Sequence, residues 1–95
     1  MRVRCVAVRV LRDSFPALVE AYLTDASGFD WQLVDKTVMF HEFDALEDPL
    51  CVLPMDVTLD CRVAMPDEGG DVVTIWLPDV SDRVYAVPRS STLPD

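Results

Sequence analysis

The chain is poor in several residue types, and each shortage narrows the range of functions. Its 95 residues include one histidine, three glycines and three cysteines. A single histidine leaves few ways to build a general base or a metal site. An odd number of cysteines without a C-x-x-C pair predicts neither a disulfide framework nor a zinc site. We therefore expect free thiols, no bound metal and a reducing, cytoplasmic location.

Positive charge is also scarce. Lys and Arg number 8 against 17 Asp and Glu, which gives a net charge of -9. This charge repels phosphate backbones and anionic lipid headgroups, so we expect no nucleic acid and no membrane as partners. No apolar run approaches the roughly 20 residues that cross a bilayer, and Arg9 and Arg12 interrupt the first apolar segment too early for a secretory signal. A basic protein, by contrast, would be attracted over long range.

Alternation of apolar and polar residues, the pattern of β-strands, is what the sequence does contain. Residues 3–11 are rich in β-branched side chains and apolar on both faces, which is typical of a central strand. A hairpin loop is expected at 25–28, where Gly28 can adopt a positive φ. Six strands are expected, at residues 3–11, 17–24, 31–40, 55–65, 71–77 and 83–87.

Two segments depart from simple alternation. The apolar residues of 31–40 change face near residues 34–37, which predicts a bulge or a kink there. Residues 41–54 have no alternation and predict a short helical or irregular crossover that ends before Pro49. We therefore expect a mainly β fold, a small antiparallel six-stranded barrel or sandwich. Residues 1–89 would form a single domain, followed by a flexible tail at 90–95.

His41 is the residue on which acid–base chemistry would depend, with Glu42 and Asp44 close to it in the sequence. Residues this close at the end of a strand rarely converge, and no glycine-flanked nucleophile supports a triad with Ser14. Neither an EF-hand spacing nor a phosphate-binding loop is present. We expect no catalytic residues and no cofactor. A small enzyme that uses His41 is a less favoured alternative, ranked after the two non-catalytic functions described below.

Acidic residues concentrate in the second half of the chain. Between His41 and Asp82 there are eleven acids and one base, Arg62. Such a run predicts either a solvated surface, which is the commoner case, or an acidic binding face. Loops often carry recognition, and an aromatic side chain among the acids could anchor a partner. The predicted partner-binding residues are Glu42, Phe43, Asp44, Glu47, Asp48, Asp56 and Asp60.

The first part of the chain contains a pattern of residues that is also found in other proteins. It consists of SFPALVE at 14–20, LTDA at 23–26, Gly28, Trp31, Asp35-Lys36, Val38 and Phe40. The pattern resembles that of small bacterial β-rich proteins of unknown function, FPxxVE…LTDAxG…W…DK…VxF. The segment from Val72 to Val87 is similar to their final hairpin. Because the matched residues belong to turns and strands, the resemblance implies a bacterial cytosolic β-domain and supplies no catalytic residues.

The expected function is that of a protein–protein interaction module without catalytic activity. Its most concrete form is an immunity protein that binds and neutralises a cognate basic toxin domain of bacteria. An acidic inhibitor suits that role because it can mimic the charge of the toxin's substrate. The alternative is a regulatory or structural β-barrel module that acts as a homodimer.

Overall fold

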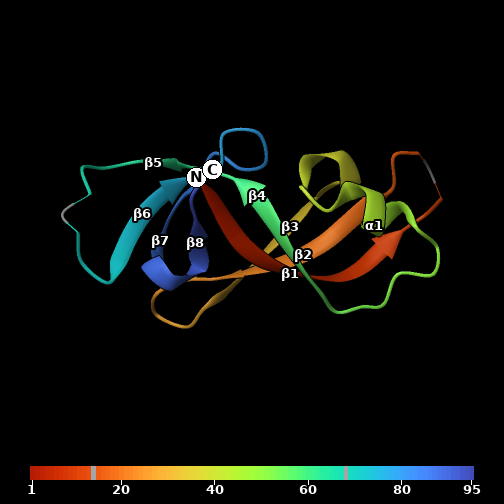
Figure 1. Cartoon of the computed structure of the whole chain (residues 1–95), viewed down its shortest axis with the longest axis horizontal. Helices are drawn as coiled ribbons and strands as arrows, with labels where there is room; N and C mark the ends of the chain where they lie inside the picture. Colours follow the sequence, from red (N-terminus) through yellow and green to blue (C-terminus); the bar gives the residue numbers. More distant parts are fainter. Residues whose placement is uncertain (14, 68) are drawn as a thin grey trace.

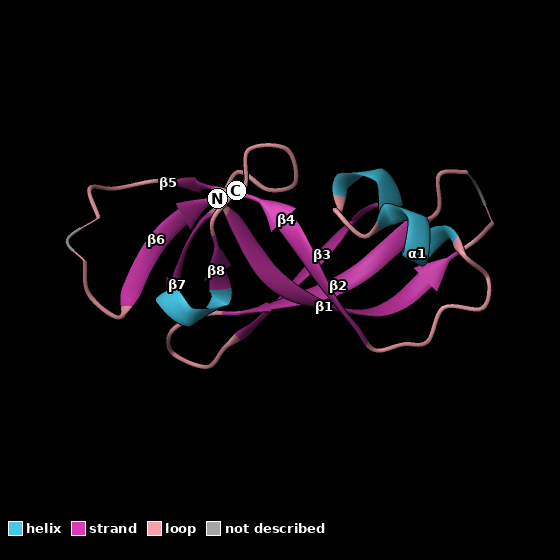
Figure 2. Ribbon diagram, in the orientation of Figure 1, coloured by secondary structure: helices cyan, strands magenta, loops and turns pink. Residues whose placement is uncertain are grey.

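The computed structural model describes residues 1–13, 15–67 and 69–95. Ser14 and Glu68, which the sequence places in turns, lie outside the described residues. The described chain is mainly β, as the alternation predicts, and its helices are short segments at the periphery of the strands (Figure 2). The strands are β1 (Arg2–Leu11), β2 (Leu18–Thr24), β3 (Asp30–Lys36), β4 (Met55–Asp60), β5 (Arg62–Val63), β6 (Val72–Trp76), β7 (Val84–Pro88) and β8 (Thr92–Leu93).

The larger sheet is antiparallel and has the strand order β3-β2-β1-β4, with β8 also paired to β1 (Figure 1). The expectation of a central first strand is therefore confirmed. Val3, Cys5 and Ala7 of β1 are buried, because alternate side chains of this strand face the core. Val57 and Leu59 of β4 are buried in the same way.

The smaller sheet has the order β5-β6-β7, so the alternating segment 55–65 is divided between two sheets. The division falls at Cys61, whose N–H donates to the carbonyl of Met1 over 2.9 Å. The next residue, Arg62, is already paired with Trp76 of the smaller sheet. In the described ranges the strands thus number eight, in two separate sheets, and no closed barrel forms.

The change of face after Trp31 results from a turn of helix. β3 ends at Lys36, and a 3-10 helix, η1 (Thr37–Met39), follows. The chain then returns to the sheet, where Phe40 bridges to Leu59. Phe40 is buried, as the apolar pattern predicts, but η1 takes the place of the expected bulge. The shift of register that a bulge would cause occurs in β1, between Ala7 and Arg9.

The irregular segment 41–54 contains one short helix, α1 (Phe43–Glu47), so the expected crossover is confirmed. The segment expected to be a flexible tail begins within a second 3-10 helix, η2 (Arg89–Ser91), and contains β8. β8 pairs with the first residues of β1, and the two chain ends lie side by side (Figure 1). This pairing is long-range, so no local pattern indicates it.

The buried side chains form one cluster that includes residues of both sheets. Phe40, Leu46 and Leu59 are among the largest side chains in it. Cys5 and Cys61 belong to this core as free thiols, and burial raises the pKa of Cys5 to about 12. The hairpin between β2 and β3 turns at Gly28, whose φ of 87° matches the expectation for a glycine there.

Candidate partner-binding site

The crossover 41–54 is fastened to the loop between β1 and β2 by the guanidinium of Arg12. This group donates hydrogen bonds to the carbonyls of Leu46 (2.8 Å), Glu47 (3.2 Å) and Asp48 (2.9 Å) at the end of α1. The last carbonyls of a helix have no partner within the helix, and a cation satisfies them well. Arg12 therefore holds two loops, 34 or more residues apart in the chain, in one fixed arrangement.

Glu47 strengthens the same junction from the other side. Its carboxylate accepts hydrogen bonds from the N–H of Ala17 (3.1 Å) and from the hydroxyl of Thr37. These bonds favour the charged form and lower the pKa of Glu47, with the Thr37 hydroxyl as the largest cause. The Glu47 carboxylate thus serves the fold, because both of its partners lie within the chain.

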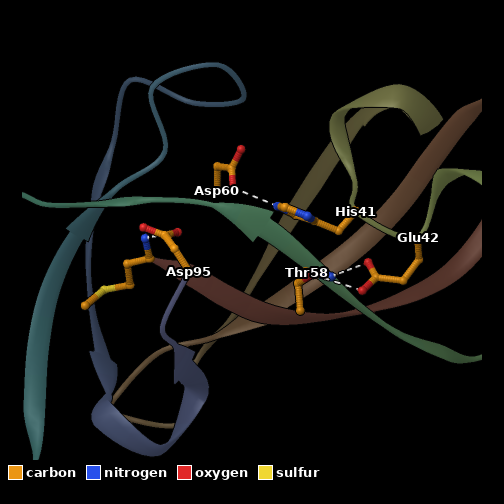
Figure 3. Close-up of polar contacts among 6 residues, drawn as sticks. His41, Glu42, Thr58, Asp60 and Asp95 are labelled. Atoms are coloured by element: carbon orange, nitrogen blue, oxygen red, sulfur yellow. Dashed lines mark hydrogen bonds and ion pairs between the residues drawn. The ribbon is translucent and has the colours of Figure 1, made fainter.

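Glu42 has a comparable internal role at the start of the crossover. Its carboxylate accepts from the N–H of Thr58 over 2.7 Å and from the Thr58 hydroxyl over 2.9 Å (Figure 3). Thr58 is buried on β4, so Glu42 satisfies a donor that water does not reach freely. Glu42 and Glu47, two of the seven predicted binding residues, therefore direct their carboxylates at donors on other elements of the fold.

Asp56 and Asp60 lie on β4, the strand that follows the crossover. The carboxylate of Asp60 is 2.7 Å from Nε2 of His41 (Figure 3). The pair is open to solvent, with side chains 41% and 71% exposed, and it borders a shallow depression of about 210 Å³. Asp56 is exposed on the sheet beside Arg4 and Tyr22.

The histidine therefore pairs with a residue that the sequence argument did not connect to it. Glu42 and Asp44 are its sequence neighbours, yet Asp60, 19 residues away, is its partner. An exposed His–Asp pair resembles the first two members of a catalytic triad. Ser14, the nucleophile considered for such a triad, lies outside the described residues.

Three of the predicted binding residues point outward from the crossover. Phe43, Asp44 and Asp48 are exposed, and the Asp48 carboxylate accepts from the N–H of Leu50 over 2.9 Å. That bond shapes the turn after α1, as Asp side chains commonly do. These residues lie at the surface of the two loops that Arg12 joins, whereas Asp56 and Asp60 lie on the sheet.

Large apolar side chains are exposed on the same two loops, and they are not among the predicted binding residues. Phe15 is 87% exposed, Leu50 85% and Val52 80%, on the two fastened loops. Both loops lie at the same end of the molecule, beside α1 (Figure 1). A local signal existed, since all three lie close to prolines in segments without alternation. We call this surface the loop end, defined by Phe15, Asp44, Asp48, Leu50 and Val52.

In the described part of the chain, no group of three or more His, Cys, Asp or Glu residues is placed to hold a metal ion. Among the same residues, no helix is long and apolar enough to span a membrane. Comparison with protein-family models, with curated proteins and with solved structures found no match to this chain.

Proposed function

We propose that this chain is a bacterial, cytoplasmic protein-binding domain without catalytic activity, and that it holds a basic protein partner at the loop end. The observation that carries the proposal is the exposure of Phe15, Leu50 and Val52 on two loops fastened by Arg12. Exposing such side chains to water is unfavourable, and burying them under a partner would lower the free energy of the complex. Mobile loops lose entropy on binding, whereas fastened loops lose less of it.

The charge of the loop end indicates the chemistry of the partner. Asp44 and Asp48 are exposed on the same crossover as Leu50 and Val52, and the whole chain carries a net charge of -9. A basic surface would be steered toward this end, and apolar contacts at the centre would then slow its release. A toxin domain that acts on nucleic acid has such a surface, so an immunity protein is the most concrete form of the proposal.

The first experiment identifies the partner. The tagged protein is expressed in its native host and co-purified, and its bound proteins are identified by mass spectrometry. The purified partner is then mixed with the protein, and the complex is measured by surface plasmon resonance at low and high salt. We expect a basic partner whose activity is inhibited on binding. A partner that is acidic, or one that binds without loss of activity, would contradict the immunity role.

The second experiment locates the surface on this chain. Asp44→Lys should slow association at low salt, and the difference should shrink at high salt because salt screens charge. Asp79→Lys is the matched control, since it changes the net charge equally but lies on an exposed loop after β6. Leu50→Ala and Val52→Ala should speed dissociation, whereas Val84→Ala, an exposed valine of β7, should not. Equal effects of Asp44→Lys and Asp79→Lys would mean that only net charge matters.

A further inference from the structure

The larger sheet ends at β3, and one side of this strand is open. β3 pairs with β2 along its full length, from Leu18 opposite Lys36 to Thr24 opposite Asp30. Across the described residues, no backbone hydrogen bond joins the other side of β3 to a further strand. The opposite edge of the sheet is better covered, because Phe40 bridges to β4 and the N–H of His41 donates to Thr58. An open edge of seven residues can accept another strand.

The hairpin geometry shows which backbone groups face outward. The N–H of Asp25 donates to the carbonyl of Phe29 over 2.9 Å, so residues 25 and 29 form a hydrogen-bonded pair. Such pairs alternate along an antiparallel ladder. Trp31, Leu33 and Asp35 therefore direct their backbone groups at β2. The residues whose groups face the open side are Asp30, Gln32, Val34 and Lys36.

The charges along this open side are complementary to those of a second copy of β3 in the antiparallel direction. Asp30 and Lys36 are exposed at opposite ends of the strand, and Lys36 is the single lysine of the chain. If two copies of β3 pair antiparallel about an axis at Leu33, Asp30 of each copy lies opposite Lys36 of the other. Gln32 of each copy then lies opposite Val34, and the outward backbone groups of these two residues meet. Shifting the register by two residues would lose both charge pairs.

We propose that two copies of this chain associate through β3 in this register and extend the larger sheet across a two-fold axis. The occupant is a second copy because the charge pattern is symmetric about Leu33, as a two-fold axis requires. The contact is small and both chains carry a charge of -9, so the dimer dissociates on dilution. The inference is independent of the proposed partner, which binds a different surface.

Val34→Pro tests the edge directly. The N–H of Val34 faces the open side, so proline removes two symmetric hydrogen bonds of the dimer, one from each copy. The bonds between β2 and β3 stay in place. Analytical ultracentrifugation of the wild-type protein should show a dimer that forms as concentration rises. The Val34→Pro protein should stay monomeric, and Val34→Thr, which keeps the N–H, should behave as wild type. A wild-type protein that stays monomeric at millimolar concentration would overturn the proposal, since Lys36 would then shield the edge.

A charge exchange tests the register even if Val34→Pro disturbs the strand. Asp30→Lys sets like charges opposite each other in the dimer, and so does Lys36→Asp. Each variant alone should therefore dimerise about tenfold more weakly than wild type. Mixed together, the two variants should form a heterodimer, because every opposed pair is again of opposite charge. A mixture that associates no better than the separate variants would overturn this register, and circular dichroism of each variant checks its fold.

Discussion

The two glutamates and the two aspartates of the crossover behave differently, although they lie within seven residues of one another. Glu42 and Glu47 direct their carboxylates at Thr58, Ala17 and Thr37, and they join the crossover to the rest of the fold. Asp44 is exposed on α1, and Asp48 is exposed in the turn after it. A run of negative charge therefore contains carboxylates that join the crossover to distant elements and carboxylates that are exposed at the surface.

The largest expected loss of stability comes from removing a glutamate that bonds within the fold. Glu42→Ala leaves the N–H and hydroxyl of Thr58 without their partner, and Thr58 is buried. We expect the free energy of unfolding to fall by about 2 kcal/mol. Asp44→Ala is the matched control and should change it by less than about 0.5 kcal/mol. Denaturation in urea measures both, and equal losses in the two variants would remove the distinction.

Arg12→Ala should have the next largest effect, because it frees the loop end from the carbonyls at the end of α1. We expect a loss of about 1 kcal/mol, since the bonds are charge-assisted but partly open to solvent. Hydrogen exchange should quicken in residues 43–52 and in the loop before β2, with little change in the smaller sheet. Arg4→Ala, an exposed arginine of β1, serves as the control. Uniform quickening across both sheets would show that Arg12 stabilises the whole fold instead.

The pH dependence of stability sharpens the comparison at Glu47. Its pKa is lower in the folded protein than the ordinary value of 4.5, so the unfolded chain binds more protons in acid. The stabilisation from Glu47 is complete above that ordinary value and is lost as pH falls through the folded value. The denaturation midpoints of wild type and Glu47→Gln should therefore converge as the pH falls through the lowered pKa of Glu47 in the folded protein. Thr37→Ser keeps the hydroxyl and should retain the wild-type profile, whereas a constant gap would contradict the cause assigned here.

The smallest effect on stability is expected where the effect on binding is largest. Asp44→Lys should leave the urea midpoint within about 0.5 kcal/mol of wild type, because the side chain is exposed. The same variant should slow association with a basic partner, as described for the loop end. A variant that unfolds would show that Asp44 holds the structure, as Glu42 and Glu47 do. A variant that binds at the wild-type rate would show that Asp44 does not steer the partner.

Much of the fold could be predicted from the sequence, because strands leave a periodic pattern. Alternation located the positions of β1, β2, β6 and β7 to within one or two residues, and the hairpin glycine was placed correctly. The crossover was recognised by its lack of alternation. The division at Cys61 was missed because both parts of 55–65 keep the same alternation, while their pairing partners are distant in the chain.

The candidate site shows where sequence reasoning ends. Composition alone determined that the segment 41–60 is acidic, and its lack of alternation determined that 41–54 interrupts the strands. Only the tertiary structure decided that Glu42 and Glu47 bond to other elements of the fold, that His41 meets Asp60, and that Arg12 joins the loop before β2 to the end of α1. The reason is physical, because these contacts join residues 10 to 36 positions apart. Each side chain turns toward a hydrogen-bond partner that only the folded chain brings near it.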